Sequence, residues 1–143
     1  MADSVNDVVP EWIEYIPDPD HLFMRVAKGW LPSGALHPGI FREIAGAISV
    51  DWEKYSTAQQ TRDRAPKPSQ FGVVELVTGK VRKIEGLSVQ HEPTGENRAH
   101  SGIHGLKVSQ SLPPEESKTK KRSDLFATIE QEGWKIDPFQ DPS

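Results

Sequence analysis

Short apolar runs separated by turn-forming residues dominate the first half of the chain. Residues 21–26, 47–50 and 71–77 are three such runs, and glycine or proline residues flank each of them. Runs of this length, rich in Val, Ile and Phe and bounded by Gly or Pro, are typical of β-strands. The pattern therefore predicts three strands, of which 71–77 is the clearest.

The second half of the chain predicts three further strands. Residues 78–80 (Thr-Gly-Lys) indicate a turn after the strand 71–77, and the apolar residues of 81–89 predict the second strand of a hairpin. Residues 98–106 alternate between small or apolar and polar side chains, which predicts another strand. Residues 134–136 predict a last short strand.

Two short helices are predicted between these strands. Residues 56–59 have the spacing of a capping box, which predicts a helix near 57–64 that the following prolines end. Ser123 is predicted to cap a second helix over 124–132, and the mostly polar residues 107–122 before it predict a connection. The sequence thus predicts an α+β fold, a small, mostly antiparallel sheet with two short helices.

The two ends of the chain differ from its middle. Residues 1–20 contain three prolines and six acidic residues but no Lys or Arg, and the apolar residues of 12–16 interrupt the acidity. A disordered tail rarely contains several large apolar residues in a row, so we expect this arm to pack on the domain or on a partner. We therefore predict an N-terminal arm (1–20), a single α+β domain (21–137) and a tail (138–143).

Composition narrows the classes of function. The 143 residues carry a formal net charge of −4 at pH 7, which gives no support to a dedicated nucleic-acid or membrane-surface binder. The chain has no cysteine, which excludes disulfides, thiolate metal sites and cysteine nucleophiles. No secretory signal and no membrane-spanning segment are evident in the sequence, so we expect a cytoplasmic protein.

His91, His100 and His104 lie close together in the sequence. On a helix, His100 and His104 would share one face and bind zinc, but the glycines between and after them argue against a helix. On a strand the same two residues would lie about 13 Å apart, which is too far for one metal ion. We therefore expect no metal site, and His100 is predicted to join a polar network beside Asn97.

Arg25 stands within an otherwise apolar predicted strand. A buried guanidinium without a partner is costly, so Arg25 requires an acidic partner or a bound anion. The carboxylates that would form a salt bridge with it are those of Glu43, Asp51 and Glu53. The other interpretation is a site for a phosphate or a carboxylate. This candidate polar or anion site consists of Arg25, Ser49, Asn97 and His100.

The chain contains four tryptophans, and some of them must build the core. Trp12 and Tyr15 lie on the acidic arm, and Trp30 lies in a turn rich in Gly and Pro. Interfaces favour exposed aromatic residues, so Trp12, Tyr15 and Trp30 are predicted to bind a partner. The basic run 118–122 is predicted to be a solvated loop, because acidic residues on both sides dilute its charge.

Several short segments between residues 21 and 137 resemble a group of small uncharacterised bacterial proteins. The resemblance implies a bacterial cytoplasmic protein without an assigned activity. The segments that carry it are Leu22-Phe23-Met24-Arg25-Val26, Phe41-Arg42, Ile48-Ser49-Val50-Asp51, Gly72-Val73-Val74, Gly86-Leu87-Ser88-Val89, Pro93, Asn97-Arg98-Ala99-His100-Ser101 and Trp134-Lys135-Ile136.

The segment 22–26 with its Arg25 also resembles the first strand of ADP-ribosyltransferases and of related NAD-degrading toxins. This second resemblance implies that Arg25 holds the phosphate of the cofactor. The chain departs from that family, because it has no Ser-Thr-Ser strand and no clear catalytic glutamate at the expected late position.

No complete catalytic motif is present, since a Gly-rich phosphate loop and a Gly-x-Ser-x-Gly nucleophile turn are both missing. The leading hypothesis is therefore a small binding or accessory protein that acts through protein–protein contacts, with a protein partner or a second copy of itself and without a cofactor. The alternative is an NAD-directed, ADP-ribosyltransferase-like or NAD-hydrolysing enzyme centred on Arg25 and His100. Nucleic-acid binding through residues 118–122 is disfavoured.

Overall fold

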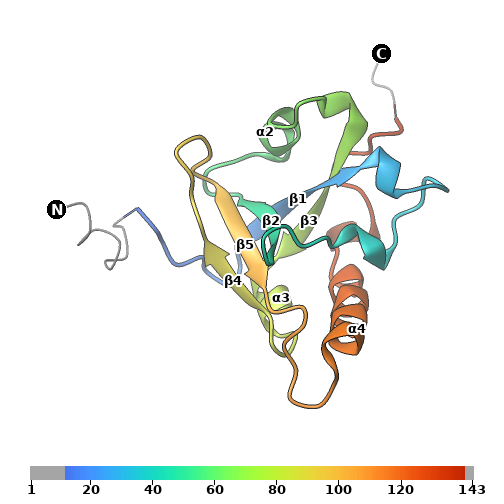
Figure 1. Cartoon of the computed structure of the whole chain (residues 1–143). Helices are drawn as coiled ribbons and strands as arrows, with labels where there is room; N and C mark the ends of the chain where they lie inside the picture. Colours follow the sequence, from blue (N-terminus) through green and yellow to red (C-terminus); the bar gives the residue numbers. More distant parts are fainter. Residues whose placement is uncertain (1–11, 141–143) are drawn as a thin grey trace.

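A computed structural model describes residues 12–140 of the chain. They form a five-stranded antiparallel sheet with the strand order β3-β1-β2-β5-β4 (Figure 1). The strands are β1 (His21–Ala27), β2 (Ala47–Trp52), β3 (Phe71–Val77), β4 (Ser88–His91) and β5 (His100–His104). The α+β fold is therefore confirmed, as are the strands predicted near 21–26, 47–50 and 71–77.

The described residues contain three α-helices, where the sequence predicted two. They are α2 (Ala58–Asp63), α3 (Thr78–Arg82) and α4 (Pro114–Ala127). Short 3-10 segments lie at Lys28–Trp30, Pro38–Ile40, Pro68–Gln70 and Glu130–Glu132. Figure 1 shows α2 on one side of the sheet and α3 and α4 on the other. None of the helices in residues 12–140 is long and apolar enough to cross a membrane.

Alternation along β1 divides the core between the two faces of the sheet. Leu22 and Met24 are buried in the larger apolar cluster, which also contains Leu125 of α4. Phe23 points to the opposite face and packs with Ala58 of α2 in a smaller cluster. The face toward α3 and α4 thus carries the main core, while α2 covers only part of the other face.

β1 and β2 pair at one end and then diverge. Their register ends at Phe23 opposite Asp51, whereas β1 pairs with β3 along its whole length. The next residues on the same face of the two strands are Arg25 and Ser49, because side chains on a strand alternate between faces. These two residues therefore lie on either side of the opening between β1 and β2.

The hairpin predicted for residues 71–77 and 81–89 is wrong. Residues 78–82 form helix α3 instead of a turn, and β3 pairs with β1 rather than with the segment that follows it. Val81 of α3 is fully buried in the main core, and this burial outweighs the local turn signal. Strand β4 pairs with β5 at the far edge of the sheet.

The helix bounds predicted for the C-terminal half are also wrong. Helix α4 begins inside the predicted polar connection 107–122 and ends before the predicted helix 124–132 does. Its buried side chains are Ser117, Lys121 and Leu125, which are four residues apart and share one face. Only one of them is apolar, so the hydrophobic pattern gave no signal for the first turns of this helix.

Helix α2 begins one residue later than predicted. Its capping box joins Thr57 and Gln60: the Gln60 N–H donates to Thr57 Oγ1 at 3.0 Å, and the Thr57 N–H donates to Gln60 Oε1 at 2.9 Å. Ser56, which the prediction placed at the cap, instead forms a 2.9 Å hydrogen bond with Thr61.

The C-terminal segment covers the outer edge of β3. The strand predicted for 134–136 is reduced to a single bridge, in which Val73 N–H donates to the carbonyl of Ile136 at 3.0 Å. Gly72 makes this close approach possible, because a Cβ at its position would lie 2.6 Å from the Ile136 carbonyl oxygen and against the ring of Trp134.

The described part of the N-terminal arm, residues 12–20, lies against the domain. Ile16 is 1% exposed and belongs to the main core. Arg82 of α3 donates to the carbonyl of Ile16 at 2.5 Å and to the carboxylate of Asp18 at 2.7 Å. Residues 12–20 therefore act as an integral part of the fold, while residues 1–11 and 141–143 lie outside the described residues.

Candidate functional site

A cavity of about 600 Å³ opens on the α2 side of the sheet, where β1 and β2 diverge. Residues of three strands share this face, because Phe23 lies opposite Asp51 and Asp51 lies opposite His100. Trp30 and the loop residues Thr94, Glu96 and Asn97 complete the walls. The polar lining residues are Arg25, Arg42, Ser49, Asp51, Thr61, Arg64, Thr94, Glu96, Asn97 and His100.

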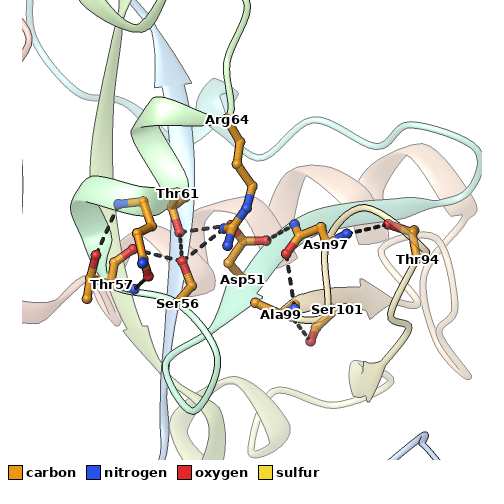
Figure 2. Close-up of polar contacts among 10 residues, drawn as sticks. Asp51, Ser56, Thr57, Thr61, Arg64, Thr94, Asn97, Ala99 and Ser101 are labelled. Atoms are coloured by element: carbon orange, nitrogen blue, oxygen red, sulfur yellow. Dashed lines mark hydrogen bonds and ion pairs between the residues drawn. The ribbon is translucent and has the colours of Figure 1, made fainter.

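One wall of the cavity is a hydrogen-bond network around Asp51 (Figure 2). Asp51 is buried, with 7% of its surface exposed. Its Oδ2 accepts from Arg64 Nη1 at 2.6 Å and from Thr61 Oγ1 at 2.8 Å. Its Oδ1 accepts from Asn97 Nδ2 at 2.9 Å, and Ser56 joins Thr61 to Arg64. A buried carboxylate with three donors is well satisfied, so this network ties β2, α2 and the loop after β4 together.

Asn97 takes part in the same network through both its amide nitrogen and its amide oxygen. Besides the donation to Asp51, its Oδ1 accepts from the N–H of Ala99 at 3.0 Å. Its backbone N–H donates to Thr94 Oγ1 at 3.0 Å. The side chain of Asn97 therefore fixes the loop beside the cavity and positions its neighbours.

Arg25 and Arg42 reach the same cavity from β1 and from the segment that precedes β2. The Arg25 guanidinium lies 5.6 Å from the centroid of the Phe71 ring, and that of Arg42 lies 4.6 Å from the centroid of the Trp30 ring. Within residues 12–140, neither guanidinium forms an ion pair or a side-chain hydrogen bond. Both cations are thus held on aromatic rings with their donors available.

Ser49 and His100 lie on the sheet surface beneath the cavity. Ser49 stands opposite Gly102 and His100 opposite Asp51, so Ser49 and His100 are diagonal neighbours on one face. The His100 ring is held by a 2.8 Å hydrogen bond between its Nδ1 and the backbone carbonyl of Glu92. The strand register and this bond together set the position of the imidazole.

The structure brings to one cavity the four residues of the predicted polar or anion site, Arg25, Ser49, Asn97 and His100. The salt bridge considered for Arg25 is not found within residues 12–140. Asp51 instead pairs with Arg64, and the carboxylate of Glu53 accepts from the backbone N–H of His21. The donors of the Arg25 guanidinium are therefore available to a ligand in the cavity.

The three clustered histidines do not meet in space. His91 faces the opposite side of the sheet from His100, and both of its ring nitrogens are bonded to backbone groups. His104 lies on the cavity face but pairs with Glu92 at 2.8 Å. Across the described residues, no group of three or more His, Asp or Glu side chains is arranged to hold a metal ion.

The residues predicted to bind a partner differ in exposure. Trp12 is 47% exposed and Tyr15 is 73% exposed, with the Arg82 guanidinium 4.7 Å from the Tyr15 ring centroid. Trp30 is half-buried against the core, with Arg42 stacked on it. Trp30 is thus a wall of the cavity and only half-buried, and its role in binding a partner stays a prediction.

The basic run 118–122 lies in helix α4, so the prediction of a solvated loop is wrong. Lys121 is buried and its ammonium donates to the carbonyl of Gly105 at 3.0 Å. Arg122 Nε donates to the carbonyl of Phe41 at 2.9 Å. These two cations stabilise the domain by capping backbone carbonyls.

A separate polar and aromatic cluster anchors the N-terminal arm on the other face of the sheet. The Glu14 carboxylate accepts hydrogen bonds from the Lys54 ammonium and the Tyr55 hydroxyl. These bonds, the one from Lys54 first, hold the pKa of Glu14 below its ordinary value. The same pair raises the pKa of Lys54.

Arg42 and the pair of Asp51 with Arg64 are the lining residues that the sequence did not reveal. Arg42 lies in an irregular segment without periodicity, so nothing in the pattern placed it near Arg25. Asp51 stands in an apolar strand, like Arg25, and its need for a partner was the available signal. The sequence does not show that a residue thirteen positions later meets that need.

No protein-family model matches the chain, and comparison with curated proteins and with solved structures finds no match. What the cavity binds must therefore follow from the chemistry of its own walls.

Proposed function

We propose that this protein binds a small organic anion in the cavity between β1 and β2. The observation that carries this proposal is the pair of guanidinium groups of Arg25 and Arg42, which line one cavity without a carboxylate partner in residues 12–140. Guanidinium donors match the oxygens of carboxylates and phosphates. An anion between the two arginines also offsets the repulsion between their charges.

The remaining lining supports a ligand with a flat apolar part. Trp30 and Phe71 supply aromatic surface, and Ile44, which is 68% exposed, adds aliphatic surface. The volume of about 600 Å³ lies within the range of about 300–1,000 Å³ that is usual for small-molecule sites. An anionic group joined to a ring satisfies both the cations and the apolar walls.

Ligand titration tests the proposal, with benzoate, phenyl phosphate, AMP and NAD as probes and with Trp fluorescence and NMR amide shifts as readouts. We expect at least one probe to bind and to shift the amides of Arg25, Arg42 and Ser49. Arg25→Gln and Arg42→Gln should each weaken binding at least about tenfold, because each removes a charged hydrogen-bond donor. Arg98→Gln, which removes an exposed guanidinium outside the cavity lining, is the matched control and should leave binding unchanged.

Failure of all four probes to bind contradicts the proposal. Binding that Arg25→Gln and Arg42→Gln leave as strong as in Arg98→Gln contradicts it as well, because the anion would then lie elsewhere.

NAD-directed catalysis is the enzymatic form of the same proposal, since NAD joins phosphates to flat rings. The resemblance of the segment 22–26 to ADP-ribosyltransferases supports it, with Arg25 as the residue that holds the phosphate. Incubation with NAD and detection of free nicotinamide tests this form. Nicotinamide release by the wild-type protein that is lost in Arg25→Ala supports an enzyme. If the wild-type protein releases no nicotinamide, the enzymatic form is rejected and the proposal of a binding protein stands.

A protein partner for the N-terminal arm is a second candidate function. Trp12, Ile13 and Tyr15 are 47%, 38% and 73% exposed on a segment that the domain holds in place. Exposed aromatic side chains on a fixed backbone favour interfaces, because little freedom is lost on binding. The resemblance to small bacterial proteins supports the bacterial cytoplasm as the setting of such an accessory protein.

Light scattering and affinity capture compare the wild-type protein with the double variant Trp12→Ser, Tyr15→Ser. We expect a dimer or a specific captured protein that the double variant loses. Val108→Ser, which removes an exposed apolar side chain elsewhere, is the control and should keep the association. A wild-type monomer that captures nothing removes this second candidate.

A further inference from the structure

We infer that the ligand of the cavity carries a hydrogen-bond donor, a hydroxyl or an amine, at the end opposite its anionic group, and that Nε2 of His100 accepts from it. This inference rests on the proposed binding of an organic anion and specifies the class of anion. It follows from the tautomer of one histidine and from the polar groups around it.

The hydrogen bond of His100 fixes its tautomer. A backbone carbonyl can only accept, so the Nδ1 atom that lies 2.8 Å from the Glu92 carbonyl oxygen must carry the proton. In the neutral ring, Nε2 then has a free lone pair. Within residues 12–140 no group is hydrogen-bonded to Nε2, and the half-buried ring lines the cavity. His100 therefore presents an acceptor to whatever occupies the cavity.

Within residues 12–140, no polar neighbour of His100 in the cavity wall forms a hydrogen bond with this lone pair. Asn97 donates one amide hydrogen to Asp51, and Arg64 directs Nη1 to the same carboxylate. Glu96 is exposed, lines the cavity and has no ion pair within residues 12–140, so it is a further acceptor. The part of the cavity beside His100 therefore favours a ligand that brings a hydrogen-bond donor. A ligand with only apolar atoms there would leave the acceptor of His100 without a partner and would bind less tightly.

The order of the strands separates the two ends of the ligand. Arg25 lies on β1, Ser49 on β2 and His100 on β5, and these strands are consecutive in the sheet. Paired strands are about 4.8 Å apart and β1 diverges from β2 beyond Phe23, so the arginine end and the histidine end are at least about 10 Å apart. Inorganic phosphate or a short carboxylate is too small to reach both ends. The ligand therefore has an anionic group and a donor separated by about one ring and a short chain.

Two pairs of probes that differ in one hydroxyl test the inference. The carboxylate pair is 3-phenylpropionate and 3-(4-hydroxyphenyl)propionate, and the phosphate pair is phenyl phosphate and 4-hydroxyphenyl phosphate. The amine 3-(4-aminomethylphenyl)propionate distinguishes a charged donor from a neutral one. Affinities are measured by calorimetry at pH 8.

We expect a donor-bearing probe to bind about three- to tenfold more tightly than its parent, which is the usual effect of one hydrogen bond. His100→Phe keeps a flat ring without an acceptor and should abolish this preference. His21→Phe makes the same change on β1 outside the cavity lining and should retain it. The inference is overturned if parent and donor probes bind the wild-type protein equally and both weaken in Arg25→Gln, an outcome that leaves the proposed anion site standing.

The ring nitrogens of His100 provide a second measurement that needs no variant. In the free protein, ¹⁵N chemical shifts should show Nδ1 protonated and Nε2 unprotonated, and the donor-bearing probe should shift Nε2 more than its parent does. A protonated Nε2 in the neutral free protein overturns the inference by itself. If no probe binds at all, the proposed function fails and the inference fails with it.

Discussion

Asp51 accepts hydrogen bonds from three side chains, two of them from helix α2 and its C-terminal end and one from the loop after β4. Its replacement by Asn would remove the charge that Arg64 requires and would place an amide N–H₂ against one of the existing donors. We expect Asp51→Asn to lower the free energy of unfolding by about 2 kcal/mol, since partial exposure of Arg64 moderates the cost. The midpoint of urea unfolding, followed by circular dichroism, measures the change.

Asp63→Asn is the control for this prediction, because Asp63 is an exposed carboxylate that, within residues 12–140, accepts only from Gln59 in α2. We expect it to change the midpoint little. Equal shifts in the two variants would mean that the network around Asp51 adds no stability beyond that of a surface carboxylate.

The sequence identified Arg25, Ser49, Asn97 and His100 as polar candidates, because a charged or polar residue beside apolar neighbours needs a partner. It did not separate the residues that hold the cavity wall from those that remain available to a ligand. Asn97 is bonded to Asp51, whereas Arg25 is not, and this difference depends on where the neighbouring strands β1 and β2 diverge. Residue types and spacing contain no information about that divergence.

At the scale of elements, β3 depends on a C-terminal segment that approaches its backbone closely. A Cβ on Gly72 would lie 2.5 Å from Pro138 Cδ and 2.6 Å from the carbonyl oxygen of Ile136. A backbone carbonyl cannot rotate away, so we expect Gly72→Ala to destabilise the protein by about 1–3 kcal/mol. The melting temperature measured by calorimetry should fall by about 3 °C for each kcal/mol.

Gly29→Ala is the matched control for the β3 edge, since a Cβ at Gly29 meets no atom within 4 Å. We expect its melting temperature to stay close to that of the wild-type protein. Equal melting temperatures for Gly72→Ala and Gly29→Ala would contradict this prediction, because they would mean that the C-terminal segment moves away from β3 without a loss of stability.

Strands β1 and β3 were predicted better than the helices because each contains a continuous run of buried, mainly apolar residues. Helix α4 escaped prediction because its inner face consists of Ser117, Lys121 and Leu125. Helix α3 escaped because residues 78–80 are also typical of a turn, and only the burial of Val81 decides between the two. Where a tertiary contact rather than periodicity selects the element, the sequence pattern is ambiguous.

At the scale of the whole molecule, the two faces of the sheet are used differently. One face carries the main core under α3 and α4, and residues 12–20 extend that core through Ile16. The other face is only partly covered by α2 and contains the cavity. Stability thus comes mainly from one face, which leaves Arg25 and His100 on the other face available for binding.

The attachment of the N-terminal arm should depend on pH through Glu14. Lys54 and Tyr55 donate to its carboxylate and lower its pKa in the folded protein, so folding favours the charged form. A lowered carboxyl pKa contributes stability above the ordinary value of 4.5, and this contribution is lost as the pH falls through the lowered pKa. We therefore expect Glu14→Gln to lower the urea midpoint at pH 6 and to lower it progressively less below pH 4.5. Glu116→Gln changes an exposed carboxylate in α4 and should show no such dependence on pH. If Glu14→Gln lowers the urea midpoint by the same amount from pH 6 to about pH 3, the role assigned to the charge of Glu14 is contradicted.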